Sequence, residues 1–326
     1  MTTLITGATG FVGAAVARRV LAEGRPVRAL VRHDSDRSNI EGLDVAVVEG
    51  DLTDAASLAE AVRGCKSVFH VAADYRIWCP DPAAMMATNV EGSRALMRAA
   101  AEAGVQRAVY TSSVATIMPH ADGTPADENT PSSVDNMIGS YKRSKYLAEQ
   151  VVLAVAEETG LEVVVVNPST PVGPRDIRPT PTGRLIRDAA AGRVPAYVET
   201  GLNIVHVDDV ADGHWLAHKR GNVGRRYILG GENMSLRKIL STVTRLAGRR
   251  PPTLQLPNPL AMGIAHMSEA VARLTGREPM ATMDGVRMAR HKMYFSSRRA
   301  CDELGYAPRP AHEALADAVA WFSKGG

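Results

Sequence analysis

The segment that most restricts the fold of this chain is the glycine-rich stretch "LITGATGFVG" near its start. Three glycines at intervals of three residues separate a short apolar run from a helical pattern. In such a turn the glycines permit a tight bend, close approach of the backbone to a pyrophosphate, and close packing of helix on strand. The helix N-terminus then offers free N–H groups to an anion. We therefore predict a dinucleotide-binding turn formed by Gly7, Thr9, Gly10, Phe11, Val12 and Gly13.

Short apolar runs alternate with amphipathic stretches through the first half of the chain. The runs lack the strict alternation of half-exposed strands and so predict buried parallel strands. They read "TLIT", "VRALV", "VAVV", "SVFHV", "RAVYTS" and "EVVVVN", and helices are expected over 11–23, 55–63, 87–103 and 141–159. This order predicts an α/β fold, a Rossmann-type doubly wound parallel sheet with right-handed crossovers.

The composition of the chain changes after Asn167, where a stretch rich in proline and glycine begins. Two later apolar runs, "NIVHV" at 203–207 and "RRYILG" at 225–230, are expected to return to the sheet. From about residue 231 the pattern is mostly helical. We predict a dinucleotide-binding Rossmann domain over 1–168 and 203–230, with a smaller, mostly helical substrate lobe over 169–202 and 231–326.

Composition excludes several classes of function. The formal net charge of the 326 residues is +3, with acids and bases interspersed, so no nucleic-acid partner is indicated. No apolar run reaches about 18 residues, which argues against membrane insertion. The three cysteines have no metal-ligand spacing, and His206 and Asp208 are interpreted as structural, so no metal is predicted. We expect a cytoplasmic enzyme with a small-molecule substrate.

The second predicted strand ends in Arg32, and Arg37 follows nearby. A basic residue at this tip can pair with a 2′-phosphate, whereas an acidic one accepts the ribose hydroxyls of NAD. Asp34, two residues on, could oppose this assignment. NADP(H) is therefore favoured, with NAD as the alternative. Further cofactor contacts are predicted after the third and fourth strands, at Asp51, Leu52, Ala72 and Ala73.

The stretch "SYKRSK" places Tyr141 and Lys145 four residues apart, on one face of a predicted helix. A phenol has a pKa near ~10, so its use at neutral pH needs a shift of ~4 kcal/mol. An ammonium ~4 Å away supplies about that amount at an effective dielectric near 20. Tyr141 could then act as general acid or base, with Lys145 lowering its pKa and holding the nicotinamide ribose. Ser113, at the end of an upstream strand, completes the predicted catalytic set.

Taken together, these motifs resemble the extended short-chain dehydrogenase/reductases, the NAD-dependent epimerase/dehydratase superfamily. The matching stretches include "TGATGFVG", "GDLTD", "NVEGS", "YTSSVAT", "YKRSK" and "NIVHVDDVADGH", in the family's order. The glycine spacing is also the short-chain variant. Within the superfamily, "HVAADYRIW" and "NPSTPVGPRDIRPTPTGR" are similar to bacterial hopanoid-associated sugar epimerases and to dihydroflavonol 4-reductase.

The resemblance implies roles for individual residues. Ser113, the second serine of the "TSS" stretch, would polarise the substrate carbonyl, and Ser112 would face the packed side. Asn89 would support the active-site helix. Pro168, Ser169 and Thr170 would lie against the nicotinamide. A homodimer through helices 87–103 and 141–159 is a further expectation of the family.

Three functions remain open at this point. The first is reduction of a ketone, or oxidation of a secondary alcohol, on a sugar-like or polycyclic substrate, with a link to hopanoid biosynthesis. The second is a nucleotide-sugar epimerase with retained NAD(P). The third, a non-catalytic NADP-binding regulator, fits less well because the serine, tyrosine and lysine are all present. The stretch "VRMARHKMYFSS" lacks the R-P-G-D-like element of nucleotide-sugar epimerases, so Arg287 and Arg290 either bind an anion or face solvent.

Substrate contacts are predicted after the fourth strand, in the proline-rich insert and in the strand that follows it. They comprise Asp74, Tyr75, Trp78, Arg178, Arg184 and Asn203, with Arg76 and Arg175 also considered. The segment "PLAMGIAHMSEAVARL" carries a methionine-rich helical stripe. Core packing or a lid is expected for it rather than membrane contact, because its polar face lacks a lysine cluster.

Overall fold

The computed structural model describes residues 1–276 and 279–324, so four positions of the predicted lobe, 277–278 and 325–326, lie outside the described residues. A seven-stranded sheet runs through the molecule in the order β10-β6-β5-β4-β1-β2-β3, and every adjacent pair is parallel. Its strands are β1 (Thr2–Thr6), β2 (Val27–Val31), β3 (Val45–Glu49), β4 (Cys65–His70), β5 (Arg107–Thr111), β6 (Glu162–Pro168) and β10 (Arg226–Leu229). The predicted doubly wound Rossmann-type sheet is confirmed.

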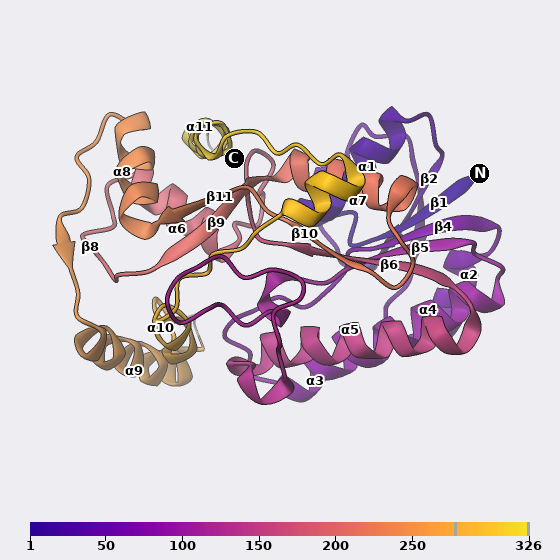
Figure 1. Cartoon of the computed structure of the whole chain (residues 1–326), viewed down its shortest axis with the longest axis horizontal. Coiled ribbons are helices and arrows are strands. Elements are labelled where there is room, and N and C mark those ends of the chain that lie inside the picture. The colour runs from indigo at the N-terminus through magenta and orange to yellow at the C-terminus, as the bar shows by residue number, and fades with distance from the viewer. Residues whose placement is uncertain (277–278, 325–326) are drawn as a thin grey trace.

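Helices cover both faces of this sheet (Figure 1). One face packs against α1 (Phe11–Ala22) and α7 (Val207–Arg220), which share an apolar core with β1, β2 and β6. The other face packs against α2 (Ala55–Val62), α4 (Gly92–Glu102) and α5 (Gly139–Thr159). Burial on two sides explains why the strands read as continuous apolar runs.

One strand differs from this pattern. The run "VAVV" is predicted to be buried, but it forms β3 at the edge of the sheet, where Val47 is 39 % exposed. An edge strand has a neighbour on one side only, so part of its side-chain surface stays in contact with water.

The strand predicted at 203–207 does not return to the central sheet. It forms β9 (Gly201–His206), which pairs parallel with β7 (Thr170–Val172) and antiparallel with β11 (Glu232–Ser235) in a separate three-stranded sheet. Prolines lack a backbone donor, and Pro168 ends β6 while Pro171 lies within β7, so the chain leaves the central ladder here. Of the two predicted returning strands, only β10 joins the central sheet. The division into two domains remains a prediction.

The second sheet carries the lobe opposite the glycine turn. Helices α6 (Pro181–Ala190), α8 (Leu236–Leu246) and α11 (Ala311–Ser323) pack on it around Ile186, Ile239 and Leu315. At the far end lie α9 (Asn258–Thr275) and α10 (Met283–Met288), beside the strand pair β8 (Ala196–Tyr197) and β12 (Leu254–Gln255) (Figure 1).

The remaining elements are short: α3 (Pro82–Met86), the π-helical turns η2 (Ala87–Glu91) and η5 (Ala300–Leu304), and the 3₁₀ turns η1 (Ser38–Ile40), η3 (Val114–Thr116) and η4 (Val134–Asn136). The predicted helix 87–103 thus begins with a π-turn before α4. Across residues 1–276 and 279–324, none of the helices combines the length and apolarity needed to cross a bilayer.

Candidate active site

The glycine turn is shaped by positions that only glycine can occupy. Gly7 has a φ of +71°, and a Cβ there would lie 2.8 Å from the backbone nitrogen of Ala72. A Cβ on Gly13 would lie 2.0 Å from the Gly7 oxygen. The turn therefore packs directly on the end of β4. Gly10 begins α1 without a side-chain cap, so the first N–H groups of that helix are available to an anion.

A residue that sequence reasoning missed holds this turn in place. Asn39 is buried, and its Nδ2 donates to the Thr9 carbonyl at 3.2 Å, while Arg18 donates to the Asn39 carbonyl at 2.8 Å. Within the described residues the Asn39 Oδ1 is buried and has no hydrogen-bond partner. The open backbone of the turn and this spare acceptor both fit a dinucleotide lying across α1.

The two arginines predicted to meet the cofactor ribose have different surroundings. Arg37 is paired with Glu49 at 2.5 Å. Arg32 is exposed at the end of β2, and in the described part of the chain no hydrogen bond or ion pair engages its guanidinium. Its charge lowers the pKa of Asp51, after the larger effect of hydrogen bonds from Thr53. Of these two arginines, Arg32 is therefore the one whose guanidinium has no partner among the described residues.

The other predicted cofactor residues line the same edge of the sheet. Asp51 accepts hydrogen bonds from the Thr53 amide at 2.8 Å and its hydroxyl at 2.7 Å, so it shapes the turn after β3. Leu52 is buried in the core, whereas Ala72 and Ala73 are partly exposed after β4.

The residues expected at the nicotinamide lie where β6 gives way to β7. Pro168 is buried as the last residue of β6, and Thr170 is partly exposed at the start of β7. The Ser169 amide donates to Leu229 of β10 at 3.1 Å. The Ser169 Oγ is buried and is one of the side-chain atoms without a partner among the described residues. A hydroxyl with an unused donor and acceptor fits a polar group of the cofactor at this position.

Ser113, Tyr141 and Lys145 come together at the carboxyl end of β5. Ser113 caps η3, and its Oγ accepts from the Ala115 amide at 3.1 Å. Tyr141 and Lys145 lie one turn apart in the first turns of α5. Burial raises the pKa of the Tyr141 phenol, while a hydrogen bond with the Ser113 side chain lowers it and the neighbouring Tyr75 raises it.

Lys145 is almost completely buried. Its ammonium donates to the Thr111 carbonyl at 2.8 Å and to the Tyr110 hydroxyl at 3.2 Å, and it lies 4.8 Å from the centre of the Tyr110 ring. Burial lowers the pKa of Lys145 to about 8, although the charge of Glu149 opposes that shift. A direct effect of Lys145 on the Tyr141 pKa stays a prediction, since burial, Ser113 and Tyr75 are the influences that the structure resolves.

Tyr110 connects Lys145 to a chain of buried polar groups. Its phenol is hydrogen-bonded to the Ser93 side chain. The Ser93 hydroxyl donates to the Asn89 carbonyl at 2.6 Å, so it must accept from His70 Nε2, 2.9 Å away. His70 Nδ1 then accepts from the Thr6 hydroxyl at 2.8 Å. This fixes His70 as the neutral Nε2–H tautomer, and burial, with a smaller effect of Lys145, lowers its pKa to about 3.

The same chain ends at the backbone beneath the cofactor turn. The Thr6 Oγ1 accepts from the amides of Val71 and Ala72 at 3.2 and 3.1 Å. A continuous set of hydrogen bonds thus joins Lys145 to the segment that Gly7 packs against. Sequence reasoning missed it, because its members come from β1, β4, α4 and β5.

Asn89 lies in the π-turn η2 and joins the loop after β4 to α5. Its Oδ1 accepts from the Asp74 amide at 2.7 Å, and its Nδ2 donates to the Asp74 carbonyl at 2.8 Å and to the Ser144 hydroxyl at 2.9 Å. Ser144 in turn donates to the Tyr141 carbonyl at 2.9 Å. π-turns of this kind often occur at functional sites. Asn89 positions the turn of α5 that carries Tyr141.

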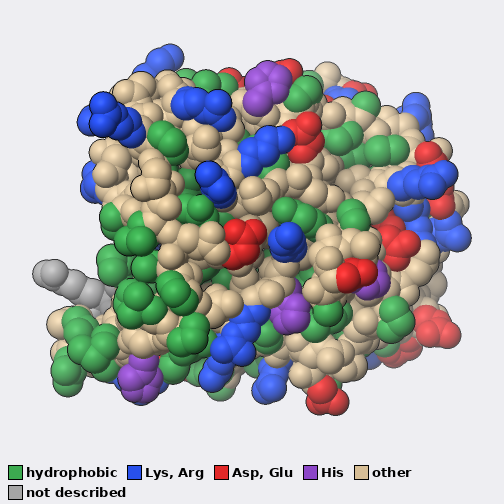
Figure 2. All heavy atoms as spheres, turned by 60° about the vertical axis from the view of Figure 1, so that its left-hand side comes forward, with side chains coloured by type: hydrophobic (Ala, Val, Ile, Leu, Met, Phe, Trp, Pro, Cys, Tyr) green, Lys and Arg blue, Asp and Glu red, His purple; other side chains and the backbone are tan. Residues whose placement is uncertain are grey.

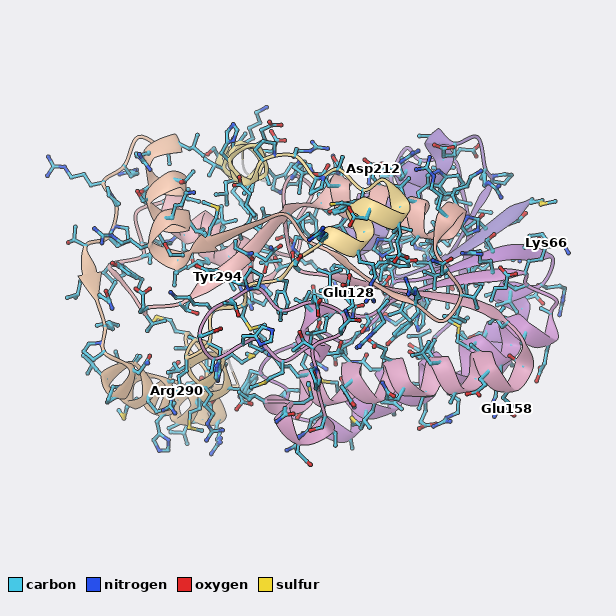
Figure 3. All side chains as sticks on the ribbon, in the orientation of Figure 1. Lys66, Glu128, Glu158, Asp212, Arg290 and Tyr294 are labelled. Carbon is cyan, nitrogen blue, oxygen red and sulfur yellow. The ribbon has the colours of Figure 1, made fainter. Side chains whose placement is uncertain are left out.

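A buried carboxylate, Glu149, supports the other side of the site. It accepts from Ser112, from Thr116 at 3.2 Å and from Asn167 at 3.2 Å, and it is ion-paired to Arg226 at 3.2 Å. Ser112 is buried, which agrees with the structural role predicted for it. A nearby carboxylate, Glu128, accepts from the Ile228 amide at 2.8 Å and anchors the loop before α5 to β10 (Figure 3).

Several predicted substrate residues gather beside Tyr141. Burial raises the pKa of Tyr75, a shift opposed by the nearby charges of Arg184 and Arg178. Asp74 is ion-paired to Arg76 at 2.5 Å, and Trp78 is half-buried in the same loop. Asp176, which the sequence did not single out, is buried beside Tyr75, and burial raises its pKa to about 6.

Two assignments are corrected by the structure. Asn203 is 0 % exposed, and its amide bonds to Gly231, Asn233 and Phe295, so it holds β9 to β11 and cannot contact a substrate. Arg175, considered as an anion clamp, is ion-paired to Asp208.

His206 and Asp208 have the structural role predicted for them. The His206 ring accepts from the Asp208 amide at 3.0 Å and caps α7. Within residues 1–276 and 279–324, histidine, cysteine, aspartate and glutamate side chains form no group of three or more that could hold a metal.

A small hollow opens at Tyr141 between α5 and α10. Its wall is formed by Ile77, Ile138, Gly139, Tyr141, Lys142, Asp284 and Met288. Three of these side chains are aliphatic or thioether groups. Lys142 is buried, which lowers its pKa to about 8. Tyr141 therefore faces a small space whose wall combines three apolar side chains with one cationic and one acidic side chain, Lys142 and Asp284.

The fold and this site define an NAD(P)-dependent oxidoreductase or epimerase with a serine–tyrosine–lysine set. The model of the NAD dependent epimerase/dehydratase family matches residues 3–230, and the chain belongs to this family. The predicted family is thereby confirmed.

Proteins similar to this chain include one named as a reductase and one named as a sterol demethylase protein. A Synechocystis sp. protein with the provisional name dihydroflavonol 4-reductase is 46% identical, over 99% of this chain and 94% of its own length. Sterol demethylase protein B of Methylococcus capsulatus is 37% identical to this chain, over 100% of this chain and 99% of its own length. Among solved structures, the protein in the crystal structure of gox2253 is 55% identical in sequence to this chain. The two structures superpose with a TM-score of 0.90, over 100% of this chain and 98% of the other chain.

Proposed function

We propose that this protein is an NADP(H)-dependent reductase of a ketone, or dehydrogenase of the corresponding secondary alcohol, on a polycyclic or otherwise largely apolar substrate. The observation that carries the proposal is the hydrogen bond between Ser113 and Tyr141 beside a hollow whose apolar wall residues, Ile77, Ile138 and Met288, outnumber its charged ones. The hydroxyls round the rim of a sugar ring would find no hydrogen-bond partners among these three side chains. The names of the reductase and sterol demethylase relatives are consistent with this substrate class.

The bound dinucleotide would supply the hydride, held by the glycine turn, by Arg32 and by the residues around Ser169. In the reducing direction the hydride adds to the carbonyl carbon. The Ser113 hydroxyl donates a hydrogen bond to the carbonyl oxygen, where negative charge develops. The Tyr141 phenol then gives its proton to that oxygen, and solvent reprotonates the phenolate. The positive charge of Lys145 stabilises the phenolate while it exists.

NADP(H) is favoured over NAD because Arg32 is exposed at the tip of β2 with no partner among the described residues. The catalytic roles of Ser113, Tyr141 and Lys145 are part of this proposal. So are the cofactor contacts of the glycine turn and the substrate contacts of Tyr75, Arg178 and Arg184.

A nucleotide-sugar epimerase with retained NAD(P) is the second candidate. The specific observation in its favour is the group of cations near Tyr141, namely Lys142, Arg178 and Arg184, which could meet a diphosphate. In that reaction a hydride would be removed and returned to the other face of the sugar.

One experiment separates the two functions. The protein is incubated with polycyclic and alkyl ketones plus NADPH, and separately with nucleotide sugars without added cofactor. Consumption of one NADPH per alcohol formed supports the reductase. Formation of a sugar isomer without net NADPH consumption supports the epimerase and contradicts the proposal.

The Tyr141→Phe variant is the control for both arms. It should lower turnover by roughly 100-fold to 10,000-fold and leave NADPH binding, measured by the fluorescence of the bound cofactor, unchanged. Full activity in this variant would show that Tyr141 is not the proton donor.

A further inference from the structure

Five large apolar side chains of α9 face solvent and not the core. Leu260, Ile264, Met267, Val271 and Leu274, here called the α9 stripe, are between 37 and 88 % exposed. Their spacing of four, three, four and three residues follows one line along the helix. The buried positions of α9 are Ala261, Ala265, Glu269 and Ala272 instead. Of the two methionines in this segment, Met262 packs against Ala261, Ala265 and Val286, whereas Met267 is 67 % exposed, so core packing holds for one and not for the other. The alternative that the helix forms a lid stays a prediction.

This arrangement leaves a long apolar face without a partner. An 18-residue helix is about 27 Å long, and the stripe runs along most of it. Figure 2 shows hydrophobic side chains gathered at the lower left of the molecule, on the side of the lobe that comes forward from the left of Figure 1. Met280 and Leu254, on either side of α9 in the chain, are also exposed. Contiguous apolar surface of this kind marks a site of interaction with a protein or a membrane.

The charged residues near the α9 stripe indicate which kind of partner it would bind. Residues 245–292 contain eight Lys and Arg residues but three Asp and Glu residues, so this segment is more positive than the whole chain, whose net charge is +3. Glu269 is buried, and Asp284 is hydrogen-bonded to Arg287 at 3.1 Å. The exposed basic residues on α9, on α10 and just after α10, here called the basic rim, are Arg273, Arg287 and Arg290. Arg273 is ion-paired to the buried Glu269 at 3.7 Å.

The basic rim does not belong to α9 alone, so the sequence of that helix by itself does not reveal it. Arg273 is on α9, but Arg287 and Arg290 belong to α10 and the residues after it, and α10 packs against α9 around Ala261, Ala265 and Val286. Figure 3 places Arg290 at the end of the lobe formed by these two helices. The tertiary fold thus supplies the cationic residues that the sequence of the helix lacks.

We propose that the α9 stripe and the basic rim form a docking surface for a bilayer that contains anionic lipid. An amphipathic helix with an apolar face and flanking cations lies in the membrane interface, with its apolar side chains among the acyl chains. The cations then meet the phosphates of the headgroups. A second copy of this chain is a poorer occupant, because a symmetric contact through this face would bring two basic rims together.

The docking surface does not depend on the catalytic proposal. It lies on the lobe that carries α10, and Met288 of α10 lines the hollow at Tyr141. A membrane held at α9 would therefore adjoin the element that forms one wall of the substrate hollow. Binding to lipid can be measured without any turnover, so its failure and the failure of the reductase assignment are separate results.

The test is cosedimentation of the full chain with large vesicles. Wild-type protein should bind vesicles of phosphatidylcholine with about 30 % phosphatidylglycerol at least about tenfold more tightly than pure phosphatidylcholine, and the difference should shrink in high salt. The double variant Met267→Asp, Val271→Asp should lose at least about tenfold of this binding. The matched control is Val223→Asp, since Val223 is similarly exposed at 53 % but lies after α7, away from α9.

Three results would overturn the proposal. One is that the wild-type protein does not bind vesicles that contain anionic lipid. Another is that the double variant, shown to be folded by circular dichroism, binds them as well as the wild type. The third is that light scattering finds a wild-type dimer that the α9 variant abolishes while lipid binding is unchanged, which would assign the face to a second copy.

Discussion

The Lys145 ammonium lies 3.2 Å from the hydroxyl oxygen and 4.8 Å from the ring centre of Tyr110, a residue that is itself fully buried. Tyr110 therefore holds the ammonium of Lys145 in a fully buried position. Because the phenol also bonds to Ser93, the position of the ammonium depends on groups from several elements of the fold.

Tyr110→Phe should shift the pH profile of the enzyme. The variant keeps the ring beside Lys145 but removes one acceptor, so the ammonium is less stable and its pKa falls below about 8. If Lys145 must be charged for activity, the alkaline limb of kcat/KM should move to lower pH by about one unit. Activity near pH 6.5 should change by less than about threefold, since Lys145 is still protonated there.

Tyr227→Phe is the matched control for this variant. Tyr227 is as buried as Tyr110, and its hydroxyl donates to Glu303 at 2.8 Å, far from the candidate site. The substitution removes this one hydroxyl. Both variants should lose about 1 kcal/mol of unfolding free energy in urea. An unshifted profile in Tyr110→Phe would show that Tyr110 is a structural residue only.

Arg32→Asp should change cofactor preference towards NAD. Removing a charge-assisted hydrogen bond to the 2′-phosphate is expected to lower kcat/KM for NADPH about tenfold or more. The new carboxylate could accept the ribose hydroxyls of NADH. Arg37→Ala is the comparison, because Arg37 is already paired with Glu49 and should affect both cofactors little. Equal losses in the two variants would contradict the role assigned to Arg32.

Asn89→Asp should loosen the active-site helix. The substitution keeps the shape of the side chain but replaces the Nδ2 donor with an oxygen that faces the Asp74 carbonyl and the Ser144 hydroxyl. We expect a loss of about 2–3 kcal/mol in unfolding free energy, with a lower kcat. Asn136→Asp serves as control, because Asn136 uses only its oxygen, accepting from Ser133. A fall in stability without any change in kcat would show that Asn89 does not position Tyr141.

The stability of the protein should fall as the solution becomes acidic. Burial lowers the pKa of His70 to about 3 and those of His214 and His218 to about 4. The unfolded chain binds protons at these groups below about pH 6.5, whereas the folded chain does not until the pH nears 4. Each histidine should therefore remove about 1.4 kcal/mol per pH unit between about pH 6 and pH 4.

His218→Phe tests this dependence on pH. His218 packs between Phe69 and Trp215, so a phenyl ring keeps the ring contacts and removes the titrating group, at the cost of a 2.8 Å bond to Ser67. The free energy of unfolding, measured in urea at pH 7.5, 6.0 and 4.5, should fall less steeply with decreasing pH for the variant than for the wild type. If the free energy of unfolding falls equally steeply with pH in the two proteins, His218 is not a source of the acid sensitivity.

Much of the fold follows from local patterns. The glycine turn, the apolar runs and the amphipathic helices predict the central sheet because each depends on residues close together in sequence. Membership of a sheet is less local. The run at 203–206 looks like a central strand, but its partners Thr170–Val172 and Glu232–Ser235 are chosen by the path of the chain between them. Asn203 was misassigned for the same reason, since only its partners show that its amide is fully used.

The sequence by itself determined the family, the cofactor turn and the residues proposed to react, because Ser113, Tyr141 and Lys145 stand in short motifs whose spacing carries the chemistry. Only the tertiary structure decided what surrounds them. The bonds of Lys145 to Tyr110 and of Glu149 to Arg226, and the outward turn of the α9 stripe beside a basic rim, join residues up to about 80 positions apart in the chain. Such contacts are set by how strands and helices pack, and packing depends on distances in space that no local pattern records.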